Sequence, residues 1–109
     1  MATERAQETV DGLPERVVAD LLASDRRRRL LGCLEDHGGC LPLTDLAAAV
    51  AAREAGVEPG AVDPERHRAV REEVYERHLP KLTATGVVEF DSMRGTVTLR
   101  RAGLAEEGR

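Results

Sequence analysis

The segment "YERHLPKLTATGVVEF", residues 75–90, decides the fold that this sequence predicts. It indicates the end of a helix, a stop at Gly86, and then a strand that begins with branched residues. A second strand is expected over 95–100, after the turn "DSMRG", because apolar residues alternate on both sides of that turn. The sequence therefore predicts a long helix that leads directly into a β-hairpin with strands at 87–91 and 95–100.

Upstream of this segment, apolar residues at helical spacing and helix-start residues predict further helices. Four helices are expected in all, starting at Pro14, at Ser24 or Asp25, at about Pro42 (ending at Ala55), and at Pro64 (ending at about Thr85). A short extended lead precedes the third of them. The order helix, helix, helix, helix, hairpin predicts a mainly α-helical domain with a small β-hairpin.

The organisation of the chain follows from its length and its ends. One chain of 109 residues fits one domain, which we place at 13–101. Residues 1–12 are polar and without periodicity, so we predict a disordered N-terminal tail, and residues 102–109 are expected to form a frayed C-terminal tail.

Composition limits the classes of function. Twenty acidic residues face fifteen arginines and a single lysine, with a net charge of -4, so the domain has no overall attraction for nucleic acid. The preference for arginine over lysine indicates a GC-rich genome, and the acidic surplus agrees with a high-salt cytoplasm. No run reaches the ~18 apolar residues of a membrane span, and the N-terminus has no apolar signal segment, so a cytoplasmic protein without membrane contact is expected.

Two blocks carry a resemblance to a known family. Residues 21–56, "LLASDRRRRLLGCLEDHGGCLPLTDLAAAVAAREAG", and residues 74–99, "VYERHLPKLTATGVVEFDSMRGTVTL", resemble an uncharacterised haloarchaeal winged-helix family. In pattern this family is related to ArsR-like winged helix-turn-helix regulators. The resemblance implies a winged-helix fold of about four helices plus a two-stranded wing, and by analogy DNA binding in transcription regulation.

The linker before the fourth helix departs from that pattern. About eight residues, Gly56 to Asp63, separate the two helices that a compact helix-turn-helix unit joins by a few residues. The usual docking angle of the following helix is therefore not assumed.

The fourth helix is a poor candidate for reading DNA bases. At 100° per residue its apolar side is predicted to be buried, and its opposite side carries four carboxylates that a phosphate-lined groove would repel. Pro80 also removes a helical hydrogen bond and is expected to bend the helix. The predicted buried stripe is Val70, Val74, Tyr75, His78, Leu79 and Leu82, and the predicted outward acids are Glu65, Glu72, Glu73 and Glu76.

Basic residues remain at two places, the start of the second helix and the wing. We predict that the protein is a small DNA-associated transcriptional regulator that binds double-stranded DNA through these basic residues. A wing arginine would lie over the phosphate backbone or in the minor groove. The alternatives are a solvated helix start and an ordinary charged hairpin tip. The candidate DNA-binding residues are Arg26, Arg27, Arg28, Arg29, Arg94, Arg100 and Arg101.

A rival function is a protein-protein interaction or dimerisation module of the same fold. The acidic face of its fourth helix would contact a basic partner protein, and the domain would not read DNA directly. A homodimer fits either function, and we expect the first helix to form its interface. The apolar residues of that helix, Val17, Val18, Leu21 and Leu22, exceed what a small core needs.

An enzyme is not expected, because no phosphate-cradling glycine loop, G-x-S-x-G elbow or H-E-x-x-H motif occurs. Cys33, His37 and Cys40 have spacing that a metal site could use, but three ligands without a fourth make a poor zinc site. The alternative places Cys33 in the core and His37 at a helix end. We therefore predict no catalytic residue, no metal and no cofactor.

Overall fold

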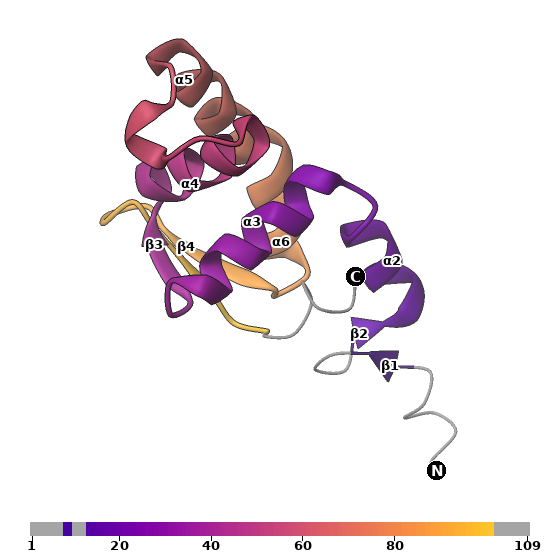
Figure 1. The fold of residues 1–109 in the computed structure, drawn as a ribbon. Helices are drawn as coiled ribbons and strands as arrows, with labels where there is room; N and C mark the ends of the chain where they lie inside the picture. The colour runs from indigo at the N-terminus through magenta and orange to yellow at the C-terminus, as the bar shows by residue number, and fades with distance from the viewer. Residues whose placement is uncertain (1–7, 10–12, 102–109) are drawn as a thin grey trace.

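Helices form most of the described part of the chain, which comprises residues 8–9 and 13–101 of a computed structural model (Figure 1). The predicted tails at 1–12 and 102–109 otherwise lie outside the described residues. Within the first of them, Glu8–Thr9 (β1) pairs antiparallel with Leu13–Pro14 (β2).

Three helices follow, close to their predicted bounds: α2 (Glu15–Leu21), α3 (Asp25–Asp36) and α4 (Leu43–Ala55). Ser24 starts α3, because its hydroxyl accepts a hydrogen bond from the Arg27 amide at 3.2 Å. Gly56 ends α4 with φ 71°, a left-handed conformation that glycine adopts without steric cost. A short 3-10 turn, Pro59–Ala61 (η1), lies in the linker.

The fourth predicted helix is continuous but changes pitch. It consists of α5 (Pro64–Glu73), a π-helical turn (η2, Val74–His78) and α6 (Leu79–Ala84). The Leu79 amide donates to the carbonyl of Val74, five residues back. Pro80, which has no amide to donate, lies two residues after the π turn, so the irregularity expected at this proline is a local widening of the helix.

The sheet has one strand more than the predicted hairpin. Val88–Asp91 (β4) and Thr96–Leu99 (β5) form the hairpin, and Cys40–Pro42 (β3), the predicted extended lead, pairs antiparallel with β5. The order is β3-β5-β4, so β5 is central. The fold is therefore mainly helical with a small three-stranded antiparallel sheet, an arrangement compatible with a winged helix, and the predicted two-stranded wing is corrected.

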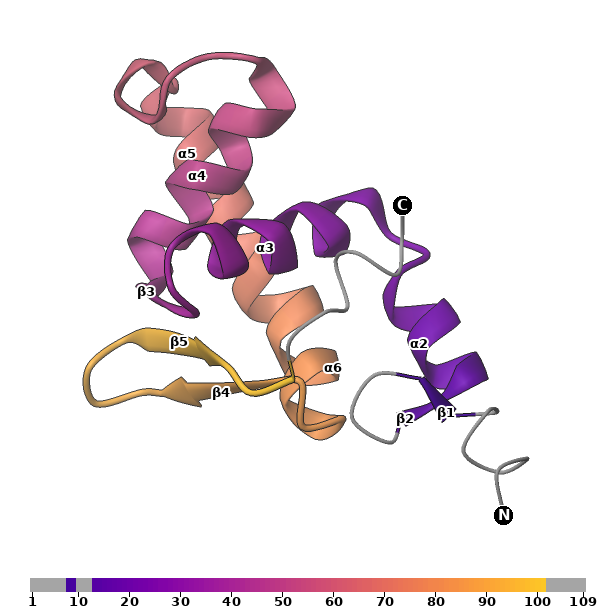
Figure 2. The ribbon, with the colours of Figure 1, turned by 60° about the horizontal axis from the view of Figure 1, so that its bottom comes forward.

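The core lies where α3 meets the other elements. Figure 2 shows α3 in the middle, with α4 and α5 on one side and the sheet on the other. Leucine and valine side chains fill this interior, as the near absence of aromatic residues predicted. The largest fully buried side chains are Leu21, Leu30, Leu31, Leu34, Leu46, Val50, Val74, Leu82, Val87, Val88 and Val97.

The apolar face of α2 belongs to this core. Val18, Leu21 and Leu22 are 5%, 0% and 9% exposed, and Val17 packs partly buried against the same cluster. The homodimer interface predicted on these residues is therefore not available, because their apolar surface is already covered by the chain itself. Among the described residues, no helix is long and apolar enough to span a membrane.

Candidate functional site

Arg26, the first of the four consecutive arginines, lies in an ion-pair cluster between three helices. Its Nε and Nη2 donate to the two carboxylate oxygens of Glu54 on α4 at 2.6 and 2.8 Å, and its Nη1 donates to Glu73 on α5. The hydrogen bond from Arg26 lowers the pKa of Glu54 against the opposing effect of burial. Arg26 therefore links α3 to α4 and α5, and all three of its guanidinium nitrogens donate to carboxylates within the protein.

Arg27 is turned into the interior and is only 9% exposed. Its Nε donates to the carbonyl of Leu21 at 2.7 Å and its Nη2 to that of Asp20 at 2.8 Å. These carbonyls belong to the last turn of α2, and that of Asp20 also accepts from the Ala23 amide at 3.3 Å. The guanidinium of Arg27, which was predicted to contact DNA, lies at the end of α2 instead of facing solvent.

The remaining two arginines of the run point in other directions. Arg28 donates to the carbonyl of Leu22 and to the carboxylate of Asp25. Arg29 is exposed, and its charge contributes to lowering the pKa of Glu54. The four arginines thus surround the start of α3, as four residues spanning one helical turn must, and they form no common basic face.

The outer surface of the long helix carries charges of both signs, because Arg66, Arg68, Arg77 and Lys81 are exposed beside its glutamates. Glu65, Glu72 and Glu76 are exposed, as predicted for the side opposite the apolar stripe. Glu73 is half-buried and faces Arg26 instead of solvent. Arg77 lies 4.0 Å from the second oxygen of Glu73. The outward carboxylates are thus fewer than predicted.

The turn between β4 and β5 presents one basic residue at its tip. The Asp91 carboxylate accepts hydrogen bonds from the amides of Met93 and Arg94 at 3.0 and 3.2 Å, and Gly95 follows with φ 70°. The Arg94 side chain is exposed. The backbone of this turn is therefore fixed by its own aspartate.

The other two predicted wing arginines lie at the far end of the hairpin. Arg100 is exposed with its Nε 3.6 Å from the Glu89 carboxylate. Arg101 is half-buried, and its guanidinium lies beside Gly86. Figures 1 and 2 both show the β4–β5 turn well away from the start of α3, so the seven predicted arginines do not converge on one surface.

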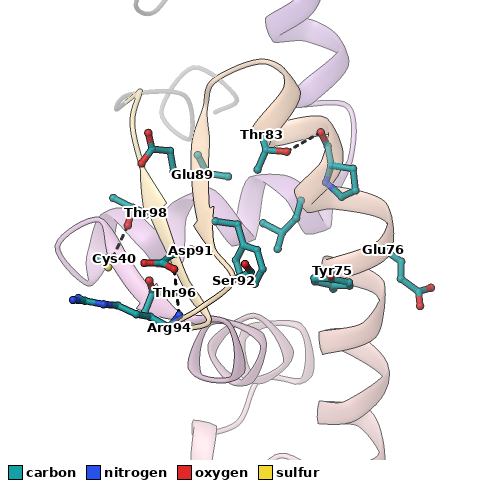
Figure 3. A pocket seen from close by; sticks show the side chains of 14 residues that line it. Cys40, Tyr75, Glu76, Thr83, Glu89, Asp91, Ser92, Arg94, Thr96 and Thr98 are labelled. Carbon is teal, nitrogen blue, oxygen red and sulfur yellow. Dashed lines mark hydrogen bonds between the residues drawn. The ribbon is translucent and has the colours of Figure 1, made fainter.

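A groove runs between the long helix and the hairpin (Figure 3). It has a volume of about 1080 Å³. The rings of Tyr75 and Phe90 touch within its lining, with centroids 5.8 Å apart and planes at 72°, an edge-to-face contact. Its apolar lining is Tyr75, Leu79, Pro80, Val88 and Phe90, and its polar lining includes Glu76, Thr83, Glu89, Asp91, Thr96 and Thr98.

Tyr75 was predicted to be buried, and this was wrong: it is 53% exposed. The angular plot assumes 100° per residue through the whole helix, and the π turn that contains Tyr75 shifts the buried residues after it away from the side on which Tyr75 lies. The signal that could have indicated the groove is the aromatic pair itself, since the sequence contains only one tyrosine and one phenylalanine.

The cysteines and His37 are separated. Cys33 is fully buried, which raises the pKa of its thiol, and the His37 Nδ1 lies 2.8 Å from the Cys33 carbonyl oxygen and donates to it. Cys40 is exposed on β3, where the Thr98 hydroxyl donates to its sulfur at 3.4 Å. In the part of the chain that the structure describes, no cluster of three or more potential metal ligands occurs.

The two further histidines contact backbone or arginine. The His67 Nε2 lies 2.9 Å from the Thr44 carbonyl oxygen. His78 is 7% exposed, and its Nδ1 lies 3.4 Å from Nη1 of Arg27. Both therefore hold elements of the fold together, α5 to the start of α4 and the π turn to α3.

Comparison with known proteins relates the chain to a family of domains. No curated protein matches the chain, and no solved structure does. The model of a domain of unknown function, DUF7344, matches residues 19–98, from the second half of α2 to β5. Because this match covers most of the sequence, the chain belongs to the DUF7344 family, a domain of unknown function.

Proposed function

We propose that residues 13–101 form a winged-helix domain that acts as a non-enzymatic protein-interaction module, with the arginine run serving the fold rather than DNA. The observation that carries this proposal is the position of Arg26, whose guanidinium lies between Glu54 and Glu73. Releasing Arg26 to a phosphate would leave the partly buried carboxylate of Glu54 without its hydrogen-bonded cation, and Glu73 with only Arg77 at 4.0 Å. Breaking such a pair costs more than a new surface contact returns.

The surface charge supports the same choice. The guanidinium of Arg27 donates to carbonyls at the end of α2. The run of four arginines that was predicted to contact phosphates therefore presents chiefly Arg29 to an outside partner. The adjoining long helix exposes three carboxylates among its basic residues, those of Glu65, Glu72 and Glu76. Binding to DNA draws its favourable free energy mainly from cations that displace counterions, and carboxylates oppose it. A protein partner that presents charges of both signs fits this mixed surface better.

The second candidate is the DNA-associated regulator, and the β4–β5 turn favours it. Arg94 is exposed on a turn whose backbone is held by the Asp91 carboxylate. A fixed, basic hairpin tip is suited to a phosphate backbone or a minor groove. One such residue supplies little affinity, so this candidate requires further arginines, such as Arg29 and Arg100, on the same partner.

Fluorescence anisotropy with duplex DNA over a salt series tests the two candidates against each other. Wild type is compared with Arg94→Ala, and with Arg68→Ala as a matched control that removes one exposed arginine from α5. The proposal predicts no saturable binding at low salt for any of them. Binding that weakens with salt, with a shallower slope in Arg94→Ala than in Arg68→Ala, would favour the DNA-associated regulator and overturn the interaction module.

Photocrosslinking supplies the positive half of the test. A photoreactive benzoylphenylalanine is placed at one exposed position at a time, at Arg29, Glu72, Tyr75 or Met93, in cells of the native host. The interaction module predicts a discrete protein adduct that depends on the position of the crosslinker. Adducts to DNA alone would contradict it.

A further inference from the structure

A hollow of about 470 Å³ lies between the start of α3 and the long helix, and we call it the α3 hollow. It is separate from the groove beside the hairpin, because no residue lines both of them. Side chains that can donate hydrogen bonds gather in it from both helices. They are Ser24, Arg26 and Arg29 from the start of α3, and Arg77 and His78 from the π turn.

His78 brings a hydrogen-bond donor to the α3 hollow. The residue is 7% exposed, and Nη1 of Arg27 donates to its Nδ1 at 3.4 Å, so the proton of the neutral imidazole is on Nε2. Nε2 has no hydrogen-bond partner among the described residues, yet it is not closed off from solvent. Since His78 lines the α3 hollow, Nε2 opens into it. A nearly buried N–H group of this kind needs an acceptor from outside the chain.

The carboxylates in the wall of the α3 hollow are already paired. Both oxygens of Glu54 accept hydrogen bonds from Arg26, which also donates to Glu73. Asp25 accepts from Arg28. These three acids are therefore neutralised within the protein, and the donors that remain in the hollow are in surplus.

Two arginines keep donors for a ligand. Arg29 is exposed and forms no ion pair with any described residue. Arg77 is 75% exposed, and its Nη1 is 4.0 Å from Glu73, too far for a hydrogen bond. The hydroxyl of Ser24 accepts from the Arg27 amide and has its own proton to donate, and the start of α3 adds the positive end of the helix dipole.

We propose that the α3 hollow binds one tetrahedral oxyanion of phosphate size, with Nε2 of His78 and the guanidinium groups of Arg29 and Arg77 as its donors. The ion is inorganic phosphate or the phosphate group of a phosphorylated side chain on a partner protein, because the donors recognise the same chemistry in both. The inference goes beyond the proposed interaction function and does not depend on it, since a free ion would bind as well.

Charge and geometry select this ligand. A cation would meet N–H donors and carboxylates whose oxygens already accept from arginines. Nucleic acid would place the phosphates on either side of the bound one beside the acids of the wall, which oppose a run of negative charges. A tetrahedral oxyanion has oxygens for donors that approach from two helices, whereas a carboxylate has only two.

Inorganic phosphate is the first probe, titrated into the full chain above neutral pH at constant ionic strength. Long-range proton–nitrogen NMR of the histidine rings reads Nε2 of His78 directly. We expect a saturable shift of this nitrogen with phosphate and none with chloride. His67, whose Nε2 lies 2.9 Å from the Thr44 carbonyl oxygen, is the internal control and is expected not to shift.

Three arginine variants locate the site. Arg29→Ala and Arg77→Ala each remove one charged donor from the α3 hollow, and each is expected to weaken phosphate binding about fivefold. Arg68→Ala removes an exposed arginine of α5 that does not line the hollow, and it is expected to leave binding unchanged. All three side chains lie at the surface, so the variants are expected to fold as the wild type does.

A short peptide with one phosphoserine distinguishes the two sources of the ion, with the serine peptide as its control. Binding at least fivefold tighter than that of inorganic phosphate assigns the site to a phosphorylated partner, and equal or weaker binding assigns it to the free ion. No saturable shift of His78 with either probe, or equal losses in Arg29→Ala, Arg77→Ala and Arg68→Ala, would overturn the proposal. Protein adducts in the photocrosslinking experiment without phosphate binding would overturn it while leaving the interaction function standing.

Discussion

Arg27 and His78 meet inside the protein although 51 positions separate them, with Nη1 of the guanidinium 3.4 Å from Nδ1 of the imidazole. The arginine is always charged, so Nδ1 is the accepting nitrogen and the imidazole is neutral. Burial first, and then the charge of Arg27, lowers the pKa of His78 below its ordinary value of 6.5. The side chains of Arg26, Glu73 and Arg77 also act on it, and only Glu73 raises its pKa.

This pair predicts a loss of stability in mild acid. Below pH 6.5 the unfolded chain protonates this histidine while the folded chain does not, so the contribution of His78 is complete above that pH and is lost as the pH falls toward the lowered pKa. Urea unfolding between pH 5 and 7.5 should show a slope of at most about 1.4 kcal/mol per pH unit from this group. His78→Gln should flatten the curve, whereas His67→Gln should keep it; equal slopes for wild type and His78→Gln would refute the assignment.

Arg26 and Glu54 should be strongly coupled in stability. Their carboxylate–guanidinium contact uses two hydrogen bonds, and the side chains are only 25% and 14% exposed. A double-mutant cycle to alanine should give a coupling energy of about 2 kcal/mol, between the values for exposed and buried pairs. The exposed pair Arg68 and Glu65 is the control, with about 0.3 kcal/mol expected. Similar couplings for the two pairs would show that Arg26 is not held as described.

The two thiols should differ sharply in reactivity. Cys40 is exposed on β3, whereas Cys33 is fully buried and burial raises the pKa of its thiol. At neutral pH a maleimide should modify one thiol per folded chain, and the second only after unfolding. Peptide mapping should place the first label on Cys40, and Cys40→Ser should abolish it. Rapid labelling of Cys33 in the folded protein would contradict the burial of α3.

Leu21 is expected to contribute to the free energy of unfolding and not to the association of two chains. It is fully buried at the end of α2, so Leu21→Ala is expected to lower the free energy of unfolding by about 3 kcal/mol. Arg16→Ala, on an exposed position of the same helix, should change it by less than about 0.5 kcal/mol. Sedimentation velocity should show the same oligomeric state for wild type and both variants. Dissociation of an oligomer in Leu21→Ala would restore the interface on α2 that the structure removes.

Local signals in the sequence were sufficient for most of the fold. Pro14, Ser24 and Asp63 mark helix starts, and Gly86 marks the stop, because capping and left-handed glycines act over a few residues. The hairpin followed from the alternation around its turn. The third strand was visible only as an extended lead, since its pairing with β5 joins segments far apart in the chain.

The candidate sites were less predictable for the same reason. The partners of Arg26 lie 28 and 47 residues away, and nothing in the run of arginines indicates that Glu54 and Glu73 would reach it. Tyr75 was misplaced because the π turn breaks the angular spacing on which the buried stripe was plotted. Charge signs can be read from a sequence, but whether a charge is free for a partner depends on contacts that only the folded chain forms.

The position of β5 between β3 and β4 also constrains the order in which the chain can fold. Leu41 pairs with Val97, so β3, in the first half of the chain, can pair only after β5, near its end, has been synthesised. During synthesis α2, α3 and α4 emerge with their local hydrogen bonds available, but the strand before α4 has no neighbour until β5 has left the ribosome. Pairing over this separation carries a loop-closure cost that is recovered only at the end. The pairing of β3 with β5 can therefore form only after β5 is available, and a chain that ends before residue 96 lacks both the central strand of the sheet and the buried Val97 of the core.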